Sequence, residues 1–235
     1  SYCYGIEAIN NLGNPAALIG HSLGEYTALC LSGYLDYKDA LKVIAVRGEE
    51  MHKAVENSNT TMAAVLTGDL EATIEEIEKL NNQGIQIWIS NFNDPSQIVI
   101  SSYIDDMNYL KSNPKALGAK RVIPLEVAGA FHTEIVSSAK KPLEDTLNSI
   151  DISEGKIPVY MNVDAKKVEV STLKENLVNQ IDNSVLFNQQ IEFVNNDIDP
   201  DLWCHIGPGN VTAGMVRKSI SYKDLKVINS LESSK

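Results

Sequence analysis

The sequence predicts an α/β protein with a larger domain, residues 1–59 and 128–235, that holds a parallel sheet, and a small domain inserted at 60–127. Two observations carry this prediction. A short apolar segment leads through a glycine-flanked serine into a helix pattern, as happens at the end of a buried strand. The hydrophobic periodicity then changes near residue 60 to alternating strands and helices, and the α/β pattern resumes near residue 128. With 235 residues, the chain has the length of one to two domains of about 150 residues each.

The first part of the chain has the pattern of one strand and two helices. Residues 16–20 are apolar and predict a short buried strand. Residues 23–32 have helical spacing and stop at Gly33, which is a typical C-terminal cap. Asp36 is a typical N-cap, and we expect the second helix to run from it to about Val55.

Residues 60–127 predict a small domain with the order strand, helix, strand, strand, helix, strand. Alternation of Ile85, Ile87 and Ile89 with other residues is typical of a half-buried strand. The order is the split βαβ, or ferredoxin-like, arrangement. The expected strands are 62–66, 85–89, 97–101 and 121–127, and the expected helices are 70–80 and 103–110.

From residue 128 the pattern returns to that of a larger α/β domain. Gly207-Pro208-Gly209 separates its last strand from a terminal helix. The expected helices are 134–149, 172–181 and 187–195, and the expected strands are 157–162 and 201–206.

The composition excludes several classes of protein. The chain is 43% hydrophobic and 22% charged, as folded globular domains are. Its 20 basic and 31 acidic side chains give a net charge of −11, which disfavours nucleic acids and anionic membranes as partners. No apolar run approaches the roughly 18 residues of a membrane span, and the opening residues lack a secretory pattern. Cys3, Cys30 and Cys204 are odd in number and not clustered, which predicts a cytoplasmic protein without a metal site.

Gly20-His21-Ser22-Leu23-Gly24 fits a nucleophile elbow. The motif lies between an expected strand and an expected helix, as Gly-x-Ser-x-Gly requires, so we expect the larger domain to be α/β-hydrolase-like. The glycines permit a tight turn that holds the serine in an unusual backbone conformation. The helix start offers the Leu23 N–H and a positive dipole end to a developing oxyanion. The alternative is that Ser22 only caps the helix.

A serine nucleophile needs a base, and the chain has four histidines. His52 lies on a helix of mixed polarity and is expected at the surface. His205 lies in an apolar strand and is expected to be a hydrogen-bonded core residue. His132 follows the strand expected at 121–127, and ligands of open α/β sheets bind where strands end. His132 is therefore the best candidate for the base.

Arg47 is a candidate for binding a substrate carboxylate. It shares one helix stripe with Ala40, Ile44 and Met51. A charge on an apolar stripe needs an anionic partner, because an uncompensated buried charge is destabilising. The partner is either an acidic side chain of the protein or a carboxylate of the substrate, which a guanidinium can bind with two hydrogen bonds.

Further motifs follow the elbow in a fixed order over essentially the whole chain. They are Gly20 to Tyr26, Arg47-Gly48, Met62 to Val65, Asn91 to Ile100, Gly129-Ala130-Phe131-His132, Asn162-Val163-Asp164 and Gly207-Pro208-Gly209. Together they resemble the malonyl-CoA:acyl-carrier-protein transacylase family, which includes an enzyme of fatty-acid synthesis and the acyltransferases of polyketide synthases.

The resemblance implies transfer of a malonyl group from malonyl-CoA to the phosphopantetheine thiol of an acyl carrier protein, through an acyl-serine and without a cofactor. It implies Ser22 as nucleophile and His132 as base, and a Gln180 carbonyl that orients the histidine. The Leu23 N–H is implied as an oxyanion donor. The implied substrate-binding residues are His21, Arg47, Phe131 and Asn162, and in the polyketide branch Phe131 and Leu23 accompany malonyl rather than methylmalonyl.

The family's first strand carries a Gly-Gln-Gly-Ser-Gln segment with a second oxyanion donor, and this segment is absent here. We therefore expect the chain to be a fragment with reduced activity. The alternatives to transfer are an acyl hydrolase that edits acyl carrier proteins and a carrier-binding module without activity.

Because both substrates are anionic, docking needs local positive charge. The candidate pairs are Lys120-Arg121, Lys140-Lys141, Lys166-Lys167 and Arg217-Lys218.

Overall fold

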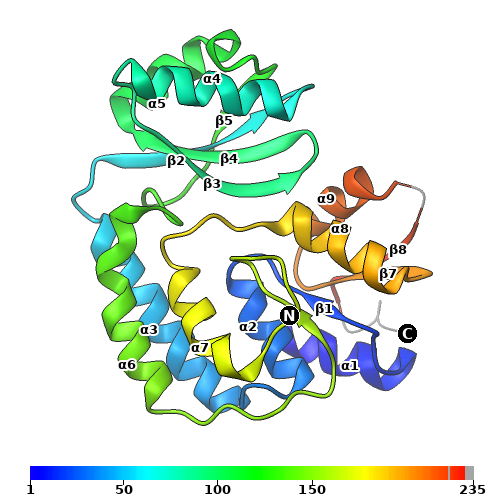
Figure 1. Ribbon diagram of the computed structural model, residues 1–235. Helices are drawn as coiled ribbons and strands as arrows, with labels where there is room; N and C mark the ends of the chain where they lie inside the picture. Colours follow the sequence, from blue (N-terminus) through cyan, green and yellow to red (C-terminus); the bar gives the residue numbers. More distant parts are fainter. Residues whose placement is uncertain (222, 231–235) are drawn as a thin grey trace.

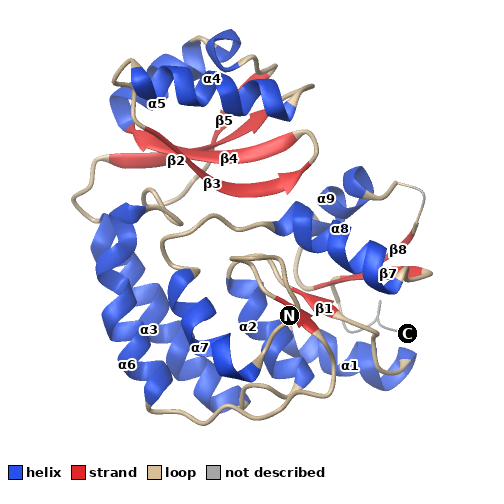
Figure 2. Ribbon diagram, in the orientation of Figure 1, coloured by secondary structure: helices blue, strands red, loops and turns tan. Residues whose placement is uncertain are grey.

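The computed structural model describes residues 1–221 and 223–230 and has a mixed α/β fold (Figure 1, Figure 2). The described strands form one antiparallel sheet of four strands and two parallel sheets of two strands each. The strands are β1 (Leu18–Ile19), β2 (Thr60–Leu66), β3 (Ile87–Asp94), β4 (Gln97–Tyr103), β5 (Arg121–Pro124), β6 (Val159–Tyr160), β7 (Leu202–Ile206) and β8 (Asp224–Ile228). The α-helices are α1 (Tyr2–Leu12), α2 (Leu23–Ser32), α3 (Tyr37–Val55), α4 (Leu70–Asn82), α5 (Ile104–Ser112), α6 (Lys140–Asn148), α7 (Val170–Asn179), α8 (Phe187–Ile198) and α9 (Val211–Ser219). Two 3₁₀ helices are η1 (Pro114–Leu117) and η2 (Glu134–Ala139).

The four-stranded sheet has the order β3-β4-β2-β5. All its pairs are antiparallel, and β2 lies against β4 from Thr60 opposite Tyr103 to Leu66 opposite Gln97. Helices α4 and α5 cover one face of this sheet (Figure 1). Alternate strand residues pack against the helices, and this core contains Ala63, Val65, Ile77, Leu80, Ile98, Ile100, Met107 and Leu110.

The rest of the described chain surrounds the two parallel pairs, β1 with β6 and β7 with β8. Because β1 and β6 have two residues each, helices contribute most of the packing. Helices α2, α3, α6 and α7 meet in one core, which contains the fully buried side chains of Leu29, Val43, Leu143, Leu173 and Leu177.

Helices α2 and α3 begin and end where the sequence predicts. Gly33 has a φ of 90° in the left-handed region, and its N–H bonds to the Cys30 carbonyl at the end of α2. The Asp36 side chain accepts hydrogen bonds from Lys38 N and Asp39 N at the start of α3. These caps fix the turn between the two helices, and the buried face of α3 carries Arg47.

The four-stranded sheet joins the rest of the protein along the edge of β3. Phe92 N donates to Val185 O, and Val185 N donates to Ser90 O, each over 2.9 Å. Residue 185 therefore extends the sheet by one parallel bridge. Lys218 of α9 also forms an ion pair of 3.1 Å with Asp94, whose side chain is buried.

Some elements differ from the sequence predictions. The strand expected at 121–127 ends at Pro124, and the strand expected at 157–162 covers only Val159–Tyr160. The helix expected over 134–149 starts as η2 and becomes an α-helix at Lys140. An α-helix continuing from 134 would need an N–H at residue 142, and Pro142 has none.

The sequence analysis did not predict α1, η1 or β8. None of the helices within residues 1–221 and 223–230 is long and apolar enough to cross a membrane.

Candidate active site

The turn between β1 and α2 holds Ser22 in a strained conformation. Its φ is 51° and its ψ is −108°, which is unusual for a residue with a side chain. A Cβ at Gly20 would lie 2.1 Å from the backbone carbon of Gly24, so only glycine allows the turn to approach the helix this closely. A Cβ at Gly24 would meet open space, so the turn requires only the first of the two glycines.

Ser22 and His132, distant in sequence, are in direct contact. The Ser22 Oγ lies 2.7 Å from His132 Nε2, and His132 Nδ1 lies 2.8 Å from the main-chain oxygen of Gln180. Since a carbonyl can only accept, Nδ1 carries the hydrogen and Nε2 is the acceptor for the serine hydroxyl. This geometry lets the imidazole take the hydroxyl proton.

His132 is buried and is itself in the left-handed region, with a φ of 59°. Burial, and then the nearby positive charge of Arg47, lowers the pKa of His132 to about 3. The imidazole is therefore neutral at neutral pH, which is the form that a base requires.

Arg47 reaches the same oxygen from α3. Its Nη2 donates to Ser22 Oγ and to Gln180 Oε1, each over 2.9 Å. Arg47 is 7% exposed, and its guanidinium carbon lies 5.7 Å from the centroid of the Tyr26 ring. Among the described residues Arg47 forms no salt bridge, and its buried Nε has no acceptor. An anion at this site would therefore meet a guanidinium that no carboxylate of the described residues contacts directly, since Glu25 is separated from it by the Gln180 amide.

Asn162 lies beneath the elbow and has no exposed surface. Its Oδ1 accepts from Ser22 N over 2.7 Å, and its Nδ2 donates to Gly20 O over 2.6 Å. Both ends of the Asn162 amide therefore hold the turn, and the expectation that Asn162 also binds substrate stays a prediction.

The remaining predicted site residues surround the dyad. The Leu23 side chain is exposed, and its N–H, at the start of α2, has no acceptor among the described residues. His21 Nε2 donates a 2.9 Å hydrogen bond to Asn93 Oδ1 of β3, and the His21 ring meets the Phe187 ring edge to face at 5.2 Å. Phe131 is half-buried and packs against the main helical core.

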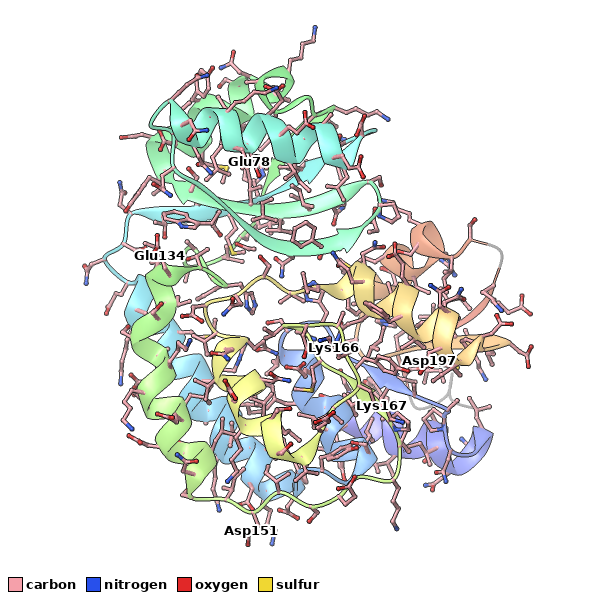
Figure 3. The ribbon with its side chains drawn as sticks, in the orientation of Figure 1. Glu78, Glu134, Asp151, Lys166, Lys167 and Asp197 are labelled. Atoms are coloured by element: carbon pink, nitrogen blue, oxygen red, sulfur yellow. The ribbon has the colours of Figure 1, made fainter. Side chains whose placement is uncertain are left out.

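A cavity of about 420 Å³ adjoins the dyad. The cavity lies between β3 and the segments that carry His132 and residues 182–184, and His132 is among its lining residues. Figure 3 labels Glu134, another lining residue, at this junction between the four-stranded sheet and the helices below it. The cavity is lined by residues 87–89, 132–134 and 182–184.

Comparison with known proteins shows which family this chain belongs to. A family model described as an acyl transferase domain matches residues 4–232. The chain belongs to the acyl transferase family.

Two kinds of relative are similar to this acyl transferase. The malonyl CoA-acyl carrier protein transacylase of Bacillus subtilis (strain 168) is 38% identical over 205 residues, which cover 87% of this chain and 64% of the relative. The chain thus spans less than two thirds of that relative. A crystal structure of the enzyme of that name from Clostridium perfringens has 32% identity and a TM-score of 0.89, covering 99% of this chain and 73% of the other. A malonyl-transacylase in complex with a type II polyketide synthase acyl-carrier protein has 28% identity and a TM-score of 0.89, covering 99% and 77%.

The sequence analysis gave no role to two residues of the acyl transferase that contact this site. Asn93 connects β3 to His21, and Glu25 accepts hydrogen bonds from Asn162 N and from the Gln180 side chain. The sequence does indicate that Glu25 is buried, because Glu25 lies on the same face of α2 as the buried residues Ala28 and Leu29.

The other histidines lie away from the dyad. His52 is exposed, as predicted. His205 is half-buried and its Nδ1 bonds to Thr212 over 2.6 Å, but its buried Nε2 has no partner among the described residues. The prediction of a fully hydrogen-bonded core histidine is therefore met at one ring nitrogen only.

Three of the candidate docking cations are occupied by acidic neighbours. Lys140 pairs with Asp182, Lys218 pairs with Asp94, and Lys141 pairs with Glu144 and Asp145. Lys166 and Lys167 lie near each other on the connection after β6 (Figure 3). Within the described residues, ion pairs are absent for Lys120, Arg121, Lys166, Lys167 and Arg217.

Proposed function

We propose that this protein transfers a malonyl group from malonyl-CoA to an acyl carrier protein through an acyl-serine at Ser22. The observation that carries the proposal is the buried Arg47 guanidinium, whose Nη2 lies 2.9 Å from Ser22 Oγ. A transferase for a dicarboxylic acyl group needs a cation beside its nucleophile, whereas an esterase for neutral acyl groups does not. The names of the relatives described above support the same assignment.

In the first step Ser22 Oγ attacks the thioester carbonyl while His132 Nε2 takes the hydroxyl proton. The carbon–sulfur bond breaks, the proton passes to the thiolate, and coenzyme A leaves as the thiol. The Leu23 N–H at the start of α2 would donate to the oxyanion. Arg47 would hold the free carboxylate with paired hydrogen bonds, so that the malonyl group stays in place on the serine.

In the second step the phosphopantetheine thiol of the carrier protein attacks the acyl-serine. His132 takes the thiol proton and returns it to Ser22, which restores the free hydroxyl. The reaction uses a nucleophile, a base and hydrogen-bond donors of the protein, in fatty-acid or polyketide synthesis. The carrier is acidic in this proposal. Of the four candidate pairs, the described cations without an ion pair, Lys120, Arg121, Lys166, Lys167 and Arg217, are the ones proposed to attract it.

The same proposal extends to the domains. Residues 60–127 form a ferredoxin-like domain inserted into an α/β-hydrolase-like domain of residues 1–59 and 128–235. The sheet order β3-β4-β2-β5 supports this division, as does the order strand, helix, strand, strand, helix, strand within 60–127.

A cytoplasmic location is supported by Cys3, Cys30 and Cys204, which are unpaired thiols.

The test is intact mass after brief incubation with malonyl-CoA, beside acetyl-CoA. A stable malonyl adduct with little acetyl adduct is expected. The Ser22→Ala variant should form neither adduct, and Arg47→Ala should lose the preference for malonyl.

Rapid loss of either adduct to water would assign the protein to the editing hydrolases instead. Carrier binding without any adduct would assign it to the carrier-binding modules. Because the pKa of His132 is about 3, protonation of His132 itself should not slow adduct formation as the pH is lowered through the usual imidazole range near 6.5.

A further inference from the structure

Glu25 occupies an unusual place for an acidic residue. It lies in the first turn of α2, three residues after Ser22, and it has no exposed surface. An acidic side chain in a first turn is favoured by the helix dipole, but it is normally solvated. This one points inward, so its hydrogen bonds must stabilise it.

Both carboxylate oxygens of Glu25 accept hydrogen bonds. Asn162 N donates to Oε1 over 2.6 Å, and Gln180 Nε2 donates to Oε2 over 2.5 Å. Among the described residues, neither oxygen faces an acceptor to which a protonated carboxyl could donate. The arrangement therefore fits an ionised carboxylate that receives two charge-assisted hydrogen bonds.

The side-chain amide of Gln180 lies between opposite charges. Its Oε1 accepts from Arg47, and its Nε2 donates to Glu25. Rotating the amide by 180° would turn its oxygen toward the carboxylate and its nitrogen toward the guanidinium. Only one orientation of Gln180 is therefore compatible with Arg47 and Glu25 together.

Gln180 and Asn162 are also the residues that hold the dyad. The main-chain oxygen of Gln180 accepts from His132 Nδ1, and its Nε2 reaches Ser22 O over 3.0 Å. The side chain of Asn162 accepts from Ser22 N. Glu25 thus joins the support of the base to the support of the nucleophile.

We propose that Glu25 is a positioning residue whose carboxylate fixes Gln180 and Asn162 and thereby holds Ser22 and His132 in reacting geometry. The inference rests on the Ser22–His132 dyad of the proposed function. It adds a residue that touches neither substrate nor the reacting atoms.

The charge of Glu25 gives this role a pH dependence. Burial raises the pKa of Glu25 to about 8, although the hydrogen bonds from Asn162 and Gln180 and the charge of Arg47 act in the opposite direction. Asp164, on the connection after β6, raises this pKa further, and Tyr26 is the other titratable group beside it. The carboxylate forms as the pH rises through about 8, so the reactivity of Ser22 should rise over the same interval.

The experiment measures the rate at which a fluorophosphonate probe labels Ser22, between about pH 6 and pH 10. Ser22 Oγ forms a bond to phosphorus, the P–F bond breaks, fluoride leaves and His132 takes the proton. The probe reports on the dyad without malonyl-CoA. Wild-type protein should label faster as the pH rises through about 8.

Glu25→Gln should label about 10- to 100-fold more slowly at high pH, because an amide nitrogen would face a donor. It should also lose the pH dependence. Asp164→Asn is the matched control: it leaves burial, the main cause of the raised Glu25 pKa, in place and removes only the smaller effect of the Asp164 charge, so the rise in rate should persist, at the same or a lower pH.

Glu25→Gln that labels like the wild type, with the same pH dependence, would overturn the proposal. A wild-type rate that does not rise between about pH 6 and pH 10 would also overturn it, and this measurement on the unaltered protein decides the matter if Glu25→Gln does not fold. A wild-type protein that forms no adduct with malonyl-CoA but labels as predicted would refute the proposed function and leave the role of Glu25 standing.

Discussion

The four-stranded sheet and the part that carries the elbow are stabilised in different ways. The sheet has strands of four to eight residues, local connections and a continuous apolar core under α4 and α5. Around the elbow, β1 and β6 have two residues each, and buried side chains connect distant segments. Asn162, Gln180 and Glu25 bond to one another and to the Ser22 turn.

The difference separates stability from reactivity. Apolar burial is tolerant of small shifts, because it has no direction. Hydrogen bonds to a strained turn fix atoms to within a few tenths of an ångström, which a nucleophile and its base require. A change in the sheet should therefore alter stability first, and a change near the elbow should alter the rate first.

The largest expected effect is on chemistry. His132→Gln keeps an amide near Ser22 but removes a base that is neutral and accepting at neutral pH. Acylation of Ser22 by malonyl-CoA should fall about 10²–10⁴-fold, the usual contribution of general base catalysis. Rapid-quench mass spectrometry measures the rate, and circular dichroism should show an unchanged fold. A loss of less than threefold would contradict the assignment of His132.

The next effect is on stability in the sheet. Ile100 of β4 is fully buried, so Ile100→Ala should lower the free energy of unfolding by about 2–5 kcal/mol. Urea denaturation measures this change. Ile104→Ala, at a residue that is 40% exposed, is the control and should change stability by less than about 0.5 kcal/mol. If folded Ile100→Ala acylated Ser22 far more slowly than wild type, the separation of stability from reactivity would be wrong.

The smallest effect tests the contact between the two regions. Burial lowers the pKa of His21 and keeps the ring neutral, so its Nε2–H can donate to Asn93 Oδ1. Asn93→Ala should cost about 0.5–1.5 kcal/mol of stability and up to roughly tenfold in acylation rate. Asn93→Asp keeps an acceptor for His21 but loses the N–H that donates to Gln97 Oε1, so it should recover part of the rate. Equal rates in Asn93→Asp and Asn93→Ala would show that this hydrogen bond has no part in the reaction.

The sequence predicts most of the fold because its signals are local. Gly33 and Asp36 mark the ends of α2 and α3, and the apolar alternation marks β2 to β4. It fails where a proline acts from a distance, as Pro142 does on the helix expected from 134.

The site is harder to predict from the sequence, because it depends on distances. The motifs and patterns around Ser22, Arg47 and His132 identify them as candidates. Their spacing along the chain does not give the distances between them in the folded protein. The support that Asn162 gives to the turn was not predicted, because hydrogen bonds beneath the elbow are invisible in the sequence. Glu25 was missed because acidic residues in a first turn are usually explained by capping.

The segment from Gln180 to Val185 is bonded to both regions, so a force on one region would be transmitted to the other. At one end its carbonyl holds His132, and at the other its backbone is bonded to the edge of β3. A force that separates the sheet from the helices would load this short segment and pull on the carbonyl that aligns the imidazole. Separating the sheet from the helices would therefore also displace the Gln180 carbonyl from His132 Nδ1, so the alignment of the base depends on the contact between the two regions.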